Sequence, residues 1–150
     1  LVRRGRRPMG PGDLAEWRLC ERHIRPISSV WQLAGAGAAG SQALTGIPRV
    51  WQLRCDPRLA QVSHIWPFET GLIHDDRPQI VFAEVYPSMI KPIEIVGKPT
   101  DAGQVVATTY HFANLDEDGG LGALFAGGDG LTEAEKTLVE QEEAWILGVT

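Results

Sequence analysis

The alternation of apolar and polar positions predicts a helix near the start of the chain. Asp13 and Glu16, three residues apart, form a capping-box pattern, and Pro26 follows as a helix-ending residue. The sequence therefore predicts a helix over residues 13–24. Its apolar positions, which recur at helical spacing, are Leu14, Trp17, Cys20 and Ile24.

Residues 28–46 are rich in alanine and glycine and give a weaker pattern. We expect a short helix capped by Ser28 or Ser29, which depends on close packing because each glycine costs about 1 kcal/mol relative to alanine. Pro48 then predicts the start of a second short helix that ends at Asp56.

Two strands are predicted in the middle of the chain. Residues 61–68 predict the first strand, and the nearly continuous apolar run 80–86, stopped by Pro87, predicts a buried second strand. Glu84 is the single charge in that run. Because a buried charge is costly without a partner, we expect Glu84 to have a partner or a function.

The last third of the chain predicts two helices joined by a glycine-rich connector. Thr100 or Asp101 caps the first, which extends to Asn114. Thr132 and Glu135 form a second capping box, which predicts a helix through Ile146.

Length and composition describe an ordinary globular chain. The 150 residues are 43% hydrophobic and 22% charged, which predicts one domain over residues 13–150. No apolar run approaches the roughly 18 residues of a membrane span, and the arginine-rich residues 1–12 lack the apolar region of a secretory signal. We therefore expect a disordered or residual basic arm over residues 1–12, a cytoplasmic location and no membrane association. Cys20 and Cys55 are interpreted as reduced, packed thiols.

Charge is unevenly distributed. Residues 1–12 contain four arginines, whereas residues 116–150 contain nine acidic residues and one lysine. The pI of about 5.3 argues against a general polyanion binder, so any contact with nucleic acid is expected to be weak and local. The acidic run is interpreted as the solvated face of the last helix and comprises Glu140, Glu142 and Glu143.

Gly35, Gly37 and Gly40 match the glycine spacing of dinucleotide-binding loops. The interval between Gly40 and Pro48 is too short for a crossover helix, which favours the alternative that small residues allow another element to approach closely.

Glu84 and Asp101 are the candidates for metal chemistry. Carboxylate oxygens are the preferred ligands of hard divalent cations, and a cation would neutralise a buried Glu84, with Asp101 as a second ligand. The structural alternative is that Glu84 pairs with an arginine and Asp101 caps its helix.

Other chemical motifs have little support. The histidines lack zinc-site spacing, and no serine lies in a GxSxG elbow. The bulky segment 66–71 either lines a pocket or interface or packs in the core, and aromatic packing is the favoured interpretation.

A series of short motifs follows in a fixed order from Arg18 to Val105. They are Arg18-x-x-Glu21, Ser29-Val30-Trp31-Gln32-Leu33, Gly35, Gly37, Gly40-Ser41-Gln42-Ala43-Leu44, Gly46-Ile47-Pro48, Trp66-Pro67-Phe68, Ala83-Glu84-Val85-Tyr86-Pro87-Ser88 and Asp101-Ala102-Gly103-Gln104-Val105. Together they resemble an uncharacterised bacterial family of predicted RNase H-like nucleases, some of whose members carry cobalamin or molybdenum-cofactor labels.

The resemblance implies an α/β fold whose carboxylates bind one or two Mg²⁺ or Mn²⁺ ions, which activate water for phosphodiester cleavage. It implies a catalytic, metal-binding role for Glu84 and a metal-binding role for Asp101. The family's opening strands and first aspartates are expected upstream of helix 13–24. We therefore expect a partial RNase H-like domain, with helices around a small mixed sheet, and an incomplete site. An incomplete sheet exposes an edge, which predicts a homodimer.

Three functional hypotheses follow. The leading one is a shortened member of this metal-dependent nuclease family, active or inactive as this chain. The second is a non-catalytic interaction or scaffold module. The third is a protein linked to cobalamin or molybdopterin cofactor metabolism.

Overall fold

The computed structural model describes residues 15–24, 26–35, 37–77 and 80–150. Their contacts divide the chain into two compact units. Unit 1 comprises Leu1–Ile65 with Arg77–Phe82, and unit 2 comprises Trp66–Asp76 with Ala83–Thr150. The fold class is mixed α/β, as predicted.

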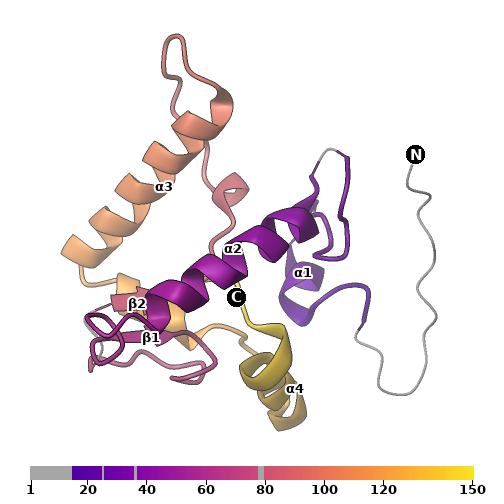
Figure 1. Cartoon of the computed structure of the whole chain (residues 1–150), viewed down its shortest axis with the longest axis vertical. Coiled ribbons are helices and arrows are strands. Elements are labelled where there is room, and N and C mark those ends of the chain that lie inside the picture. The colour runs from indigo at the N-terminus through magenta and orange to yellow at the C-terminus, as the bar shows by residue number, and fades with distance from the viewer. Residues whose placement is uncertain (1–14, 25, 36, 78–79) are drawn as a thin grey trace. The chain divides into compact units, whose positions relative to one another are not determined.

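Unit 1 combines two helices with a two-stranded sheet (Figure 1). The helices are α1 (Leu19–His23) and α2 (Ala39–Arg54). Strands β1 (Ser63–Ile65) and β2 (Ile80–Phe82) pair in parallel, with His64 opposite Val81. Each strand is shorter than predicted. The described part of the chain shows only this parallel pair, so the antiparallel pairing that a mixed sheet requires is not found there.

Helix α1 is shorter than the predicted helix 13–24, and Asp13 lies outside the described residues. Arg18 occupies the N-cap position, and its backbone N–H donates to the Glu21 carboxylate at 3.0 Å. Because Arg18 takes the N-cap position and donates to Glu21, the helix begins at Leu19, six residues later than predicted.

Helix α2 is one continuous helix and contains both Gly46 and Pro48. The predicted restart at Pro48 is therefore wrong, as is the predicted helix after Ser28, where the chain turns at residues 30–31 instead. Pro48 removes one N–H from the helical ladder, but the helix continues past it to Arg54.

Unit 2 contains one long helix and several short ones. They are η1 (Pro87–Met89), α3 (Thr100–Glu117), η2 (Leu121–Ala126), α4 (Glu133–Leu138) and η3 (Val139–Glu143), the last a π-helical turn. Helix α3 confirms the prediction, although Pro99 rather than Thr100 or Asp101 stands at its N-cap. At Gly103, a Cβ would lie 1.9 Å from the carbonyl oxygen of Ile93, so only glycine permits this approach.

The core of unit 2 is built from tryptophans and the end of the chain. Trp66 packs edge-on against Phe125, with ring centroids 5.6 Å apart, and its indole N–H donates to the Phe125 carbonyl at 3.1 Å. Trp145 and Ile146 are also almost completely buried. The packing interpretation of segment 66–71 is thus confirmed for Trp66, whereas Phe68 is exposed.

The last helix begins as predicted but ends early. The Thr132 hydroxyl accepts from the Glu135 N–H at 3.3 Å, and the Thr132 N–H donates to the Glu135 carboxylate at 2.9 Å, which confirms the capping box. After η3, Ala144 has a positive φ of 60°, and the chain leaves the helix. Ile146 instead joins an isolated parallel bridge with Glu84.

The acidic run near the end of the chain is not a fully solvated face. Glu143 is buried, and the Glu140 carboxylate accepts the backbone N–H of Leu72 at 3.0 Å. Only Glu142 is exposed. Within the described residues, no helix combines the length and hydropathy needed to cross a bilayer. The RNase H-like topology and the single domain over residues 13–150 stay predictions.

Candidate functional site

Glu84 lies beyond the end of β2, because the strand predicted over residues 80–86 stops at Phe82. Its backbone takes part in the bridge to Ile146, and its carbonyl accepts the N–H of Leu147 at 2.9 Å. The residue itself is exposed. The argument that Glu84 is a buried charge in need of a metal is therefore wrong: the backbone is paired in the bridge while the residue remains accessible to water.

Asp101 is also exposed and lies in the first turn of α3. It is not the N-cap, but a carboxylate in this turn is favourable beside the helix dipole. Across the part of the chain that the structure describes, no group of three or more His, Cys, Asp or Glu side chains is suited to hold a metal ion. A Mg²⁺ or Mn²⁺ site that includes Glu84 and Asp101 stays a prediction.

Gly40, the last glycine of the motif, permits close packing. A Cβ on Gly40 would lie 2.0 Å from the carbonyl oxygen of Val30, and the Gly40 N–H donates to the carbonyl of Gln32 at 3.1 Å. The turn before α2 therefore packs directly on its first residues, as the packing interpretation requires. The supporting argument from length was wrong, since α2 continues far beyond Pro48.

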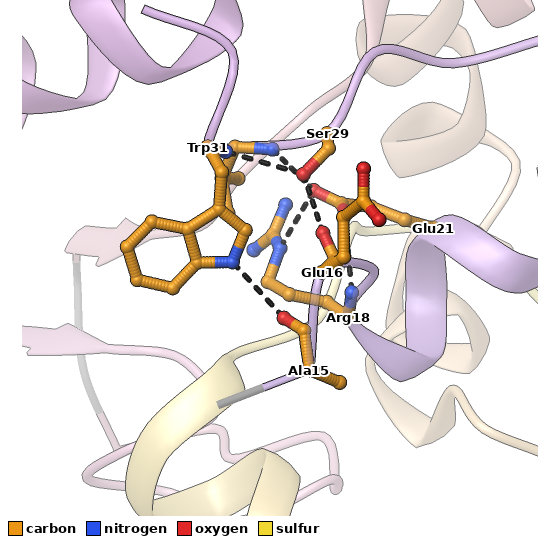
Figure 2. Close-up of polar contacts among 7 residues, drawn as sticks. Ala15, Glu16, Arg18, Glu21, Ser29 and Trp31 are labelled. Carbon is orange, nitrogen blue, oxygen red and sulfur yellow. Dashed lines mark hydrogen bonds and ion pairs between the residues drawn. The ribbon is translucent and has the colours of Figure 1, made fainter. Parts of the chain in front are cut away.

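A buried carboxylate organises the segment before α2 (Figure 2). Glu21 is completely buried and accepts three N–H groups: the backbone N–H of Arg18 at 3.0 Å, the Arg18 Nε at 3.0 Å and the backbone N–H of Val30 at 3.2 Å. The Arg18 side chain is itself only 12% exposed. The hydrogen bond from Val30 joins α1 to the turn that packs on Gly40.

Three further hydrogen bonds hold the same turn (Figure 2). The Ser29 hydroxyl donates to the carbonyl of Glu16 and accepts the N–H of Trp31 at 3.2 Å. The Trp31 indole N–H donates to the carbonyl of Ala15 at 3.0 Å. Residues 29–31 are thus fixed against residues 15–21, and the start of α2 rests on a rigid support.

Beyond this anchored start, α2 is mostly exposed. Gly40 is its only buried residue, and Leu44, Ile47 and Trp51 are 67%, 66% and 61% exposed. Spacings of four and three residues place these three side chains on one side of the helix, in line with Gly40. We call Leu44, Ile47 and Trp51 the α2 stripe.

The stripe escaped sequence analysis because the helix was expected to break at Pro48, which separates Ile47 from Trp51. If the helix is divided there, Leu44, Ile47 and Trp51 no longer belong to one helical series. The available signal was the uninterrupted recurrence of apolar residues from Leu44 to Trp51.

The cysteines differ in environment. Cys20 is buried, as predicted, whereas Cys55, directly after α2, is exposed, so its predicted packing is wrong.

No family model, curated protein sequence or solved structure matches the chain.

Proposed function

We propose that this chain acts as an interaction module that docks an apolar segment of another polypeptide on the α2 stripe. The observation that carries the proposal is the exposure of three large apolar side chains at helical spacing. Single exposed apolar residues are ordinary, but contiguous patches mark binding surfaces. Grooves and faces of this type commonly receive an amphipathic helix through anchors at i, i+3 and i+7.

The anchoring of α2 supports the proposal. A docking surface that is already ordered loses less conformational entropy on binding. The contact at Gly40 and the ion pair of Glu21 with Arg18 hold the start of the helix, so the stripe is presented by a supported element.

The charge of α2 indicates the chemistry of the partner. The helix has no acidic residue, and Arg54, seven residues after Ile47, lies beside the stripe, whereas Arg49 lies on the opposite side of the helix. We infer that the partner segment presents an apolar stripe flanked by carboxylates, because complementary charge favours encounter and orientation.

The expected contribution of the stripe follows from the area it would cover. Full burial of a Leu or Ile side chain contributes about 1.5–3 kcal/mol, so covering the exposed two-thirds of Leu44 and of Ile47 contributes roughly 1–2 kcal/mol each. Trp51 adds roughly 3 kcal/mol by the same reasoning. Association itself costs at least about 4 kcal/mol, so the stripe supports a modest affinity unless the partner also covers neighbouring surface.

A peptide titration tests this function. Two labelled helical peptides with the same apolar stripe, one flanked by glutamates and one by lysines, are titrated with the protein and followed by fluorescence anisotropy. We expect the acidic peptide to bind and Ile47→Ser to weaken it roughly 5- to 30-fold.

Leu53→Ser is the matched control. Leu53 is 48% exposed but lies on another side of α2, six residues after Ile47. Equal weakening by both variants, or preference for the lysine peptide, contradicts the proposal. Self-association that Ile47→Ser abolishes also contradicts it, because the occupant is then a second copy.

Metal-dependent phosphodiester hydrolysis is the second candidate. Glu84 follows the carboxyl end of β2 by two residues, and α/β folds place their reactive groups beyond the carboxyl ends of parallel strands. This position supports a role for Glu84 in a nuclease that is completed by further carboxylates.

Calorimetric titration with Mn²⁺ tests this candidate. The proposal predicts weak binding that disappears in Glu84→Ala and persists in Glu94→Ala, where a second exposed carboxylate of the same unit is removed. Equal binding by both variants removes Glu84 from the proposed site. The cytoplasmic location and the link to cobalamin or molybdopterin metabolism stay predictions.

A further inference from the structure

Unit 2 contains a cavity of about 260 Å³ between α3 and the end of the chain. Its walls come from residues 85–90, from α3, from η2 and from residues 147–148. All of these residues belong to unit 2, so the cavity is a property of one compact unit.

The walls are tied to one another by hydrogen bonds. The Leu147 N–H donates to the carbonyl of Glu84 at 2.9 Å, which joins the start of the 85–90 wall to the C-terminal wall. The Gln104 amide donates to the Ser88 hydroxyl at 3.4 Å, which joins the same wall to α3. The cavity is therefore framed by connected elements rather than by a single loop.

The lining selects against charged ligands. Most of the side chains that face the cavity are apolar, and the described lining includes no Asp, Glu, Lys or Arg. Its polar members are Tyr86, Thr108 and His111. Transfer of an ion into such surroundings is unfavourable without a paired charge, so the lining favours a neutral molecule.

Thr108 supplies the specific feature. The residue is 9% exposed, and its hydroxyl oxygen is buried without a hydrogen-bond partner. A buried hydroxyl without a partner is unfavourable by about 1–3 kcal/mol. Threonine in a helix has two accessible χ1 rotamers, and we infer that a ligand in the cavity selects the one that turns the hydroxyl toward it.

We propose that this cavity binds a small, neutral, flat aromatic molecule that carries one hydroxyl or other hydrogen-bonding group, which pairs with Thr108. The size follows from volume, since an apolar cavity of roughly 150 Å³ is known to hold benzene. A cavity of about 260 Å³ accordingly accommodates a bicyclic ring system. This site lies in unit 2 and does not depend on the function proposed for α2.

The test compares 2-naphthol with naphthalene, which differ by one hydroxyl. Binding to the full chain is followed by shifts of the Thr108 and His111 backbone amide resonances. We expect 2-naphthol to bind more tightly than naphthalene, and Thr108→Val to weaken 2-naphthol roughly fivefold while leaving naphthalene unchanged.

A cavity-filling variant provides the second readout. Met89 lines the cavity and is 47% exposed, so Met89→Trp is expected to abolish binding of both probes. Val96→Trp is the control, because Val96 is 95% exposed and does not line the cavity. Failure of 2-naphthol to shift these resonances at millimolar concentration overturns the proposal. An equal effect of Thr108→Val on both probes overturns the role of the hydroxyl.

Discussion

Replacement of Glu21 by glutamine changes one atom of a buried carboxylate and removes its charge. In the folded chain the two carboxylate oxygens accept from Arg18 twice and from Val30 once. Glutamine keeps one acceptor oxygen, but its amide N–H group faces a donor instead of accepting from it. The Arg18 guanidinium, only 12% exposed, also loses its counter-charge.

The expected cost is large relative to the stability of a small domain. Removal of one partner from a buried ion pair typically costs 3–5 kcal/mol, so we expect Glu21→Gln to destabilise unit 1 by about 3 kcal/mol. Domains are typically stable by only 5–15 kcal/mol. The change corresponds to a decrease in Tm of roughly 6–12 °C.

Denaturant unfolding followed by tryptophan fluorescence measures this change, and hydrogen exchange at the Val30 amide localises it. Glu16→Gln is the control, since Glu16 is exposed and contributes its carbonyl rather than its carboxylate to the cluster. If the free energies of unfolding of Glu21→Gln and Glu16→Gln differ by less than about 0.5 kcal/mol, the precision expected of such comparisons, the account of this ion pair is refuted.

A double substitution examines the pair further. Arg18→Leu combined with Glu21→Leu removes both charges, and replacement of a buried pair by apolar residues is often close to neutral. We expect only partial recovery here, because the backbone N–H groups of Arg18 and Val30 still lose their acceptor.

Four further predictions follow from local geometry. Gly46→Ala is expected to stabilise α2 by about 1 kcal/mol, because no atom lies within 4 Å of the new Cβ. Gly40→Ala is expected to destabilise α2, because its Cβ meets the Val30 carbonyl. Thermal unfolding distinguishes the two variants. Arg58 lowers the pKa of Asp56 from the ordinary value of 3.8 to about 2, chiefly through side-chain hydrogen bonds. The contribution of ionised Asp56 to folding stability is therefore present above pH 3.8 and is lost as the pH falls through about 2. NMR titration should show this pKa, and Arg58→Gln should raise it. The rise should be only partial, because the backbone N–H of residue 58 still donates to Asp56. Thr132→Ala removes the cap of α4 and should lower stability by about 1 kcal/mol in denaturant unfolding; no change would contradict the capping geometry. The predicted homodimer through a sheet edge should give a mass above that of the monomer in sedimentation at high concentration. A mass equal to that of the monomer would exclude it.

Several elements were predictable because their signals are local. The Thr132–Glu135 capping box depends on four consecutive residues and appears where expected. Helix α3 follows Pro99 and contains no proline, so its extent was predicted within a few residues. The parallel partner and register of β2 were not predictable, because they depend on tertiary contacts.

Other features depend on competition that a local pattern does not reveal. Glu84 was expected in a buried strand, but Ile146 from the end of the chain pairs with its backbone and leaves the residue exposed. The helix predicted through Ile146 ends at Glu143 because Trp145 and Ile146 are buried in the core of unit 2 instead. In both cases a tertiary contact outweighs local periodicity.

The candidate site shows the same division. Carboxylate identity at Glu84 and Asp101 suggested metal chemistry, but metal binding needs convergence of several ligands, which sequence spacing does not establish. The α2 stripe was not predicted, because the sequence analysis divided at Pro48 a helix that is continuous.

The most direct test of the account follows the tryptophan indole N–H resonances during titration with the glutamate-flanked amphipathic peptide. The account predicts a saturable shift of the Trp51 indole, with Trp66 and Trp145 unchanged because both are buried in the core of unit 2. Saturable binding without a shift of Trp51, or no binding at all, would contradict the proposal that α2 is the docking surface.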